Sequence, residues 1–240
     1  MLDATFIKAY SRRDPNDNGR GYSDFEARLR KQGRNVVLGY GVHLAVDAGS
    51  EMLLAVTVEP ANVNEKKAAP PLLYKAMKNR HRWKSLIADS QYSSEAFRIE
   101  ARRYGVEPVI PYPRNQMRGK QVLRIDRKFR SHGPSKLRRL YRKRSAVERV
   151  VSRLKTHYGL CQLRTRSLRN VSSHMLLCLL ALLATALSAI KHGHTDKMRS
   201  PVQLIKLTGP KQYCKRLARS ALKYLTPYEY LEKLKVTQIA

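Results

Sequence analysis

Short apolar runs rich in strand-forming residues recur along the first 110 residues and predict a set of β-strands. Between Val36–Val46 and Met52–Val58 the segment Asp47–Ser50 has the composition of a turn, so these two runs predict an antiparallel hairpin. The polar stretch Arg12–Arg34 predicts a loop with a short helix around Asp24–Lys31. The complete set of predicted strands is Leu2–Lys8, Val36–Val46, Met52–Val58, Trp83–Ala88 and Val106–Ile110.

Helices are predicted between the later strands and after the last one, because the apolar residues there have helical spacing. Two helices are predicted at Asn64–Asn79 and Ser93–Tyr104, with Asn64 and Ser93 as caps and Gly105 as the stop. A basic, loop-like insertion covers about residues 111–136 and precedes a long helix from Leu137 to about Tyr158. The order of strands and helices predicts an α/β fold. We expect one domain at residues 1–191 and a basic helical C-terminal tail at 192–240, with helices near Lys211–Tyr224 and Pro227–Lys235.

One apolar run, Met175–Ile190, has only Thr185 and Ser188 as polar residues. A helix that crosses a bilayer needs about 20 apolar residues, and this run has 16. We therefore favour a buried core helix over a membrane span. A basic membrane-associated protein is the alternative that this run leaves open.

Charge changes the picture most. The 240 residues include 48 Lys and Arg against 18 Asp and Glu, a formal net charge of +30, while 42% hydrophobic residues are enough for a folded core. Such a charge is typical of a protein that binds a polyanion, with nucleic acid ahead of an acidic membrane surface. Nineteen of the basic residues lie between Pro111 and Asn170, together with only two acids, Asp126 and Glu148.

The cysteines argue against other classes of protein. Cys161, Cys178 and Cys214 are odd in number and widely spaced, which disfavours a zinc ribbon or a disulfide framework. The first ten residues lack the pattern of a signal peptide. A reduced, cytoplasmic setting is therefore expected, with the protein at the nucleoid when it is bound to DNA.

Three acids have positions that favour chemistry: Asp3, Asp89 and Glu148. Asp89 follows a predicted strand, and functional sites of α/β sheets gather at such strand ends, although Asp also caps helices and opens turns. Glu148 is nearly alone among basic residues. On one continuous helix Tyr141, Arg144, Glu148 and Lys155 would share a stripe about 60° wide. The buried edge beside that stripe would be formed by Val147, Val150, Val151 and Leu154.

The spaced residues Tyr141, Arg144, Glu148 and Lys155 resemble the Tyr-Arg-Glu-Lys signature of DDE transposases from bacterial insertion sequences. Three shorter segments are also similar to segments of that family. They are Leu2-Asp3-Ala4-Thr5, Gly39-Tyr40-Gly41-Val42-His43-Leu44 and Ala88-Asp89-Ser90-Gln91-Tyr92. The resemblance covers about residues 1–190 and implies a ribonuclease-H-like mixed sheet flanked by helices.

The resemblance also implies a mechanism. Asp3, Asp89 and Glu148 would be the catalytic acids and would bind two Mg²⁺ ions, with Mn²⁺ able to substitute, for DNA cleavage and strand transfer at element ends. Tyr141, Arg144 and Lys155 would bind DNA, and the neighbouring Arg149 and Arg153 are expected to do the same. The implied partners are double-stranded DNA, as element ends and target, and a second copy of the chain on paired ends. The rival hypothesis is an inactive or truncated basic DNA-binding protein derived from a transposase.

Two further residues are interpreted as structural. Asp47 competes with Asp3 for the role of first acid. Between Asp47 and the strand that begins at Trp83, however, the sequence predicts only one strand and one helix. A ribonuclease-H-like sheet needs three strands and a helix between its first two acids, so we expect Asp47 to be a turn residue. His43 is expected to be a structural strand residue. Family members usually carry a DNA-binding region ahead of the first acid, and only two residues precede Asp3 here, so we expect that region to be lacking.

Overall fold

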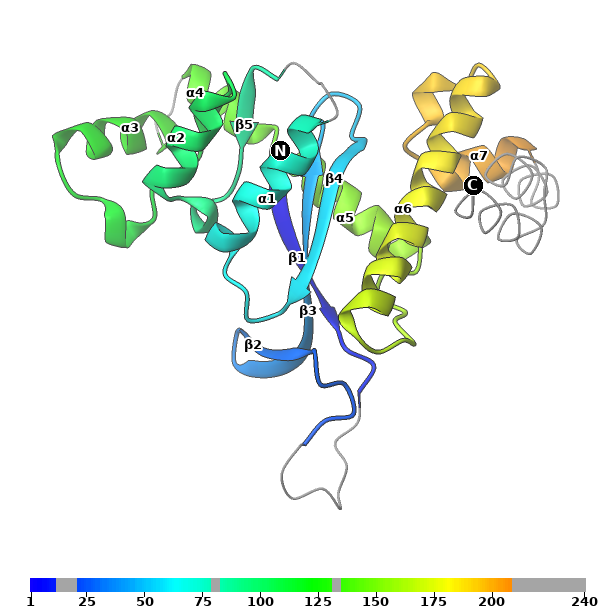
Figure 1. The fold of residues 1–240 in the computed structure, drawn as a ribbon. Coiled ribbons are helices and arrows are strands. Elements are labelled where there is room, and N and C mark those ends of the chain that lie inside the picture. The colour runs from blue at the N-terminus through cyan, green and yellow to red at the C-terminus, as the bar shows by residue number, and fades with distance from the viewer. Residues whose placement is uncertain (12–20, 79–82, 131–134, 209–240) are drawn as a thin grey trace, which may run out of the picture. The chain divides into compact units, whose positions relative to one another are not determined.

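The computed structural model describes residues 1–11, 21–78, 83–130 and 135–208 (Figure 1). Its strands are β1 Leu2–Lys8, β2 Arg28–Gln32, β3 Asn35–Val46, β4 Leu53–Pro60, β5 Ser85–Ile87 and β6 Glu107–Val109. Its α-helices are α1 Glu65–Lys78, α2 Glu95–Arg103, α3 Lys120–Arg130, α4 Lys136–Arg142, α5 Ser145–His157, α6 Leu168–Lys191 and α7 Pro201–Thr208. Short 3₁₀ helices are η1 Ser90–Tyr92, η2 Arg114–Gln116 and η3 Thr195–Lys197. The chain divides into two compact units, Met1–Met175 and Leu176–Ala240.

The long strand β3 organises the first unit. It pairs antiparallel with β1, β2 and β4, and the register with β1 places Asp3 opposite Leu44. Strands β5 and β6 form a separate two-stranded parallel sheet. The chain therefore combines antiparallel and parallel pairing with flanking helices, which confirms the mixed α/β prediction and is consistent with a ribonuclease-H-like transposase domain.

One core joins the two sheets. Leu2 of β1, Leu72 of α1 and Leu86 of β5 are each at most 1% exposed and belong to the same apolar cluster, with Phe97 of α2 and Ile110 after β6. Figure 1 shows α1 in front of the strands of the first unit and α5 behind them. Burial of these side chains fixes the β1 and β5 ends, and hence the segments that carry Asp3 and Asp89, against the same helices.

Several predicted elements are confirmed nearly residue for residue, including β1 and the β3–β4 hairpin. Asp47 is a turn residue as expected. Its Oδ2 accepts hydrogen bonds from the backbone N of Ser50 at 2.7 Å, the Ser50 hydroxyl at 2.8 Å and the Gly49 N at 3.1 Å. Asn64 caps α1 by accepting from the Lys66 N at 2.9 Å. Gly105, at φ +72°, ends α2 in a left-handed conformation that an L-residue disfavours.

Other predictions are wrong. The short helix expected at Asp24–Lys31 is replaced by β2, which forms a hairpin with β3 through Gly33 at φ +61°. The expected loop over residues 111–136 contains the 11-residue helix α3. Helix α2 is capped by Ser94 and not by Ser93, since the Ser94 hydroxyl accepts from the Phe97 N at 3.2 Å.

The long helix predicted over Leu137–Tyr158 is divided into α4 and α5. At the junction, backbone bonds shorten to the i→i−3 pattern, such as Arg144 N to Tyr141 O at 2.9 Å and Val147 N to Arg144 O at 3.2 Å. The break changes the angles at which side chains project from the helix. The predicted alignment of Tyr141, Arg144, Glu148 and Lys155 on one stripe assumed an unbroken helix.

The apolar run Met175–Ile190 lies within α6. Its 24 residues are long and apolar enough to cross a membrane by length and composition, and a core helix of a soluble protein meets the same criteria. The side chains of Met175, Cys178, Leu182, Ala186 and Ala189 are buried, so α6 does bury one stripe. The helices predicted near Lys211–Tyr224 and Pro227–Lys235 lie outside the described residues.

Candidate active site

Asp3 is the second residue of β1, and its side chain is partly buried. Its Oδ1 accepts a hydrogen bond from the Ala4 N at 2.9 Å. Burial raises the pKa of Asp3 above its usual value, and the charges of Asp89 and Glu148 raise it further, while the Ala4 N–H and the Arg144 guanidinium lower it. The three acids therefore act on one another electrostatically, although their positions in the chain lie far apart.

Asp89 lies where the parallel strand β5 ends and η1 begins. Its Oδ1 accepts from the Ser90 N at 2.6 Å, which is the capping role that sequence alone allowed. Its Oδ2 lies 3.6 Å from Arg144 Nη1. One carboxylate oxygen thus fixes the turn after β5, and the other is available to the site.

Arg144 links the second and third acids. Its Nη2 lies 2.9 Å from Glu148 Oε1 in an i,i+4 ion pair, and its Nη1 is the atom that approaches Asp89. The Arg144 side chain is 28% exposed, against 53% for Glu148. Since Glu148 lies in the first turn of α5, the α4–α5 junction sets the position of both residues.

Tyr141 stands beside this arginine. The Arg144 Cζ lies 5.8 Å from the centre of the Tyr141 ring, and the ring meets Phe129 of α3 edge-on at 5.4 Å between centroids. Burial and the neighbouring Asp89 charge raise the pKa of Tyr141. Tyr141, Arg144 and Glu148 are therefore brought together as the sequence pattern indicated, despite the break in the helix. Lys155 lies elsewhere, in a groove beside Ala4, Thr5 and Phe6 of β1.

The donor set matches the chemistry of Mg²⁺, a cation that prefers carboxylate oxygens. Within the described residues, however, no group of three or more His, Cys, Asp and Glu side chains lies close enough to hold a metal ion. Between Asp89 and Glu148 the structure places the guanidinium of Arg144.

Arg149 and Arg153 hold Glu51, a residue that the sequence analysis did not single out. Arg149 donates to Glu51 Oε1 from Nε at 2.8 Å and from Nη2 at 2.6 Å, and Arg153 Nη2 donates to Oε2 at 2.6 Å. The Glu51 side chain is 4% exposed and lies in the β3–β4 connection at φ +60°. These contacts fasten α5 to the sheet. No spacing rule finds Glu51, because the paired residues lie 98 and 102 positions apart.

His43 is buried, as a structural role requires. It is 1% exposed, and its Nδ1 lies 3.2 Å from the hydroxyl of Tyr92. Burial is the main cause that lowers its pKa to about 4; the Glu65 charge opposes this shift and the Arg30 charge adds to it. Burial raises the pKa of Tyr92 as well, and the nearby Asp3 charge adds to that shift. His43 pairs with Ala4, next to Asp3, and Tyr92 belongs to η1, which begins after Asp89, so this buried contact links the two segments that carry these acids.

Arg98 is a second structural residue that sequence analysis missed. It is 4% exposed, donates to the Ser93 hydroxyl at 2.9 Å and the Ile110 carbonyl at 2.8 Å, and packs over the Tyr112 ring at 4.1 Å. It therefore ties the segment after η1 to the end of β6. Next to Asp89, a hollow of about 270 Å³ is lined by polar residues, among them Asn64, Ser90, Gln91 and Asn115.

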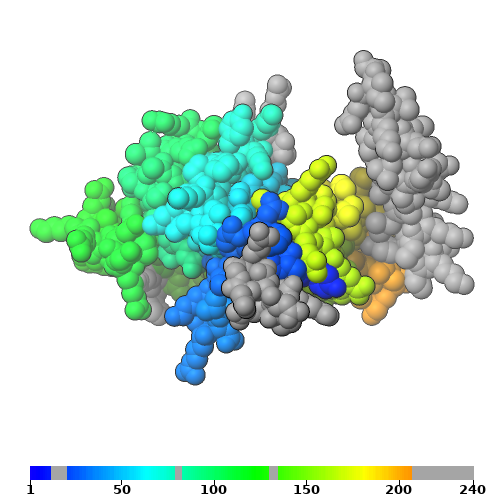
Figure 2. Space-filling model, turned by 60° about the horizontal axis from the view of Figure 1, so that its bottom comes forward, coloured from blue at the N-terminus to red at the C-terminus, as the bar shows by residue number. Residues whose placement is uncertain are grey.

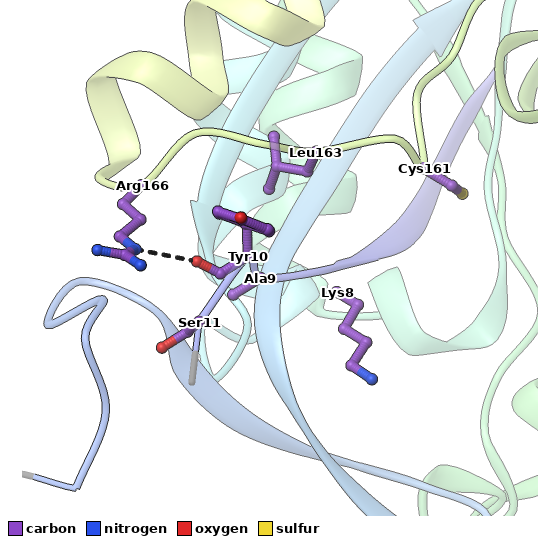
Figure 3. Close-up of a pocket in the computed structure, with 7 residues that line it drawn as sticks. All are labelled: Lys8, Ala9, Tyr10, Ser11, Cys161, Leu163 and Arg166. Atoms are coloured by element: carbon purple, nitrogen blue, oxygen red, sulfur yellow. Dashed lines mark hydrogen bonds between the residues drawn. The ribbon is translucent and has the colours of Figure 1, made fainter. Parts of the chain in front are cut away.

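A larger hollow, of about 320 Å³, lies at the other end of β1 and is lined by Lys8, Ala9, Tyr10, Ser11, Cys161, Leu163 and Arg166 (Figure 3). There the Arg166 Nε donates to the Tyr10 carbonyl at 3.3 Å. Its distance from Asp3 along an extended strand is about 20 Å or more, so it does not belong to the three-acid site.

The mixed α/β domain places the guanidinium of Arg144 between Asp89 and Glu148, which come from distant segments of a strongly basic chain. The family model of the transposase DDE domain matches residues 1–184, which includes every residue of this site, and the chain therefore belongs to the DDE transposase family. A comparison with curated proteins found no match. Members of this family act on DNA, and the net charge of +30 fits that partner.

Proposed function

We propose that this chain is the catalytic domain of an insertion-sequence transposase that cuts DNA at element ends and joins the cut strand to a target, with Asp3, Asp89 and Glu148 as its catalytic acids. The observation that carries the proposal is the contact of Arg144 with both Asp89 and Glu148, while the pKa of Asp3 responds to all three. These observations support a charged centre to which β1, the end of β5 and α5 would each contribute one acid. We also propose that the chain belongs to the group of DDE transposases with the Tyr-Arg-Glu-Lys signature, on the residues Tyr141, Arg144, Glu148 and Lys155.

In this proposal the three carboxylates hold two Mg²⁺ ions, or Mn²⁺ in their place. Bound there, the ions supply activation of the attacking oxygen and relief of charge on the leaving oxygen. Arg144 exchanges its carboxylate partners for a DNA phosphate, to which a guanidinium can donate two parallel hydrogen bonds. Tyr141 packs against the DNA end and Lys155 binds the backbone as a point charge. Arg149 and Arg153 bind Glu51 within the protein, and in this proposal they can contact DNA in addition.

The proposed partners are double-stranded DNA, as element ends and as target, and a second copy of the chain when two ends are paired. The proposed setting is the cytoplasm, at the nucleoid while DNA is bound, with α6 as a core helix and not a membrane span. Residues 1–191 would form the catalytic domain and 192–240 the basic tail.

A second candidate function has an observation in its favour. Arg144 lies between two of the acids, and the described residues contain no ready-made metal cluster. Both facts would also be seen in a transposase-derived protein that binds DNA without cutting it. The two candidates predict equal binding to DNA and different behaviour with divalent ions.

The test is nicking and strand transfer on DNA that carries the ends of the element encoding this chain. Wild type is compared with Asp89→Asn and Glu148→Gln, with and without Mg²⁺ or Mn²⁺, and with the exposed Glu95→Gln as a control of matched chemistry. Metal-dependent cutting by wild type and Glu95→Gln, lost in the two site variants, is the expected result. Equal activity in all four proteins rules out the proposed site, and binding without cutting by wild type favours the second candidate.

A further inference from the structure

A second feature adjoins the three-acid site: a groove of about 410 Å³ between β1, β2 and α5. It begins at Ala4, the residue directly after Asp3, and continues along β1. Its lining comes from three separate segments of the chain and consists of Ala4, Thr5, Phe6, Arg30, Lys31, Gln32 and Lys155. The groove therefore lies on the strand that carries the first acid.

The β2 wall of the groove is held by contacts of its own. Residues Arg28–Gln32 pair with Asn35–Gly39 of β3, and the Arg30 guanidinium forms an ion pair with Glu65 at the start of α1. Glu65 is buried, which makes this an anchored contact and not a loose surface pair. Figure 2 shows the hairpin, in mid-blue, projecting from the surface of the first unit. Because Arg30 is occupied with Glu65, its neighbours Lys31 and Gln32 are the exposed polar residues of this wall.

The opposite wall is α5. Lys155 lies seven residues after Glu148, a separation of about 10 Å along a helix axis. It is exposed, and it shares the groove with residues of β1. The groove is thus tied to the acids twice, by Asp3 through β1 and by Glu148 through α5.

The charge of the groove has one sign. Three of its seven lining residues are basic and none is acidic. Among the described residues, neither Lys31 nor Lys155 forms an ion pair. Two ammonium groups without counter-ions in one groove favour an anion between them.

We propose that this groove binds the sugar-phosphate backbone of one DNA strand, next to the phosphate that reacts, with Lys31 and Lys155 on either side of a backbone phosphate. The proposal rests on the proposed function and adds the β2–β3 hairpin to the DNA-binding surface. Contacts of this kind fix the register of the DNA without reading its sequence. The next hollow along β1 is not included, because its Arg166 guanidinium is already bonded to Tyr10.

The experiment measures binding of a DNA duplex with a single-stranded flap, by fluorescence anisotropy in EDTA, at several salt concentrations. Lys31→Ala is compared with wild type, with Lys31→Arg and with Lys75→Ala, an exposed lysine of α1 that removes the same charge. Loss of one phosphate contact is expected to weaken binding by about fivefold at moderate salt and to reduce the slope of log K against log salt by about 0.7–0.9. Lys31→Arg restores both values, and Lys75→Ala changes neither.

A second arm locates the contact. Single flap phosphates are replaced one at a time by uncharged methylphosphonates. At one or two positions beside the cleavage point, the replacement weakens binding by wild type and has no further effect on Lys31→Ala. If Lys31→Ala behaves like Lys75→Ala, or if every replacement weakens both proteins equally, the groove does not bind DNA.

The result of this binding experiment does not depend on whether the protein cuts DNA. Cutting by wild type together with a silent Lys31→Ala overturns the groove and leaves the catalytic proposal standing. Phosphate-specific coupling to Lys31 in a protein that never cuts DNA supports the groove and overturns the catalytic proposal.

Discussion

Replacing Glu51 by Gln tests whether the acid beneath α5 is a major contributor to the stability of the first unit. The change keeps the shape of the side chain, removes its charge and turns one acceptor oxygen into an amide that faces a guanidinium. The Glu51 carboxylate accepts hydrogen bonds from Arg149 at 2.8 and 2.6 Å and from Arg153 at 2.6 Å. Loss of the charge leaves Arg153 with its guanidinium held in a poorly solvated place.

The expected magnitude follows from exposure. Removing one partner of a buried ion pair costs about 3–5 kcal/mol. Arg149 is 55% exposed, so its share is reduced by solvent screening, whereas Arg153 is 15% exposed and keeps most of its contribution. We therefore expect Glu51→Gln to lower the free energy of unfolding by about 2–4 kcal/mol. For a protein of this size the midpoint of thermal unfolding would fall by about 8 °C.

Urea unfolding followed by circular dichroism measures this difference. The control is Glu95→Gln, which breaks the exposed pair with Arg102 at 3.9 Å and is expected to cost at most about 0.5 kcal/mol. The double variant Glu51→Gln with Arg153→Met removes the stranded charge and should recover part of the loss. A Glu51→Gln protein as stable as Glu95→Gln would refute the reasoning.

Three more predictions concern separate groups. The pKa of His43 is lowered to about 4, so between pH 6.5 and 4 the unfolded chain binds a proton that the folded chain does not; stability should fall by up to about 3 kcal/mol over this window and level off below it. His43→Gln should remove that part of the slope in urea titrations, and parallel curves for the two proteins would contradict the burial argument. Arg144→Gln removes a cation that lowers the pKa of Asp3, so the acidic limb of metal-dependent cleavage should move to higher pH, and an unmoved limb would argue against their coupling. Ser94→Ala should cost about 1 kcal/mol in the same urea assay because α2 loses its cap, and no change there would assign the cap elsewhere.

The sequence predicted the parts of the fold that depend on local patterns. β1 was predicted at its observed bounds because Leu2–Lys8 is a short apolar run rich in strand-forming residues. The turn at Asp47 followed from its residue types. The hairpin strand β2 could not be found in this way, since Arg28-Leu29-Arg30-Lys31-Gln32 has no apolar alternation and is stabilised as a strand by its pairing with β3.

The candidate site shows the same division. The spacing of Tyr141, Arg144 and Glu148 led to residues that do lie together, because Arg144 contacts the other two. The straight helix assumed for them was wrong, because the backbone changes to i→i−3 hydrogen bonds between α4 and α5, and apolar periodicity does not reveal such a change. The roles of Glu51 and Arg98 depend on long-range packing, and such contacts leave no local signal in one sequence.

The contacts of Glu51 with Arg149 and Arg153 also have a consequence for folding during synthesis. The chain emerges from the ribosome with the whole β3–β4 hairpin, including Glu51, about 100 residues ahead of its two arginine partners. A carboxylate cannot be buried at that stage without a counter-charge, so the connection after β3 must stay hydrated until residue 153 arrives. Contacts that span this much sequence form late in folding. The helix that carries Glu148 is therefore also the element that supplies the counter-charge for Glu51, and a chain cut short before it would lose both.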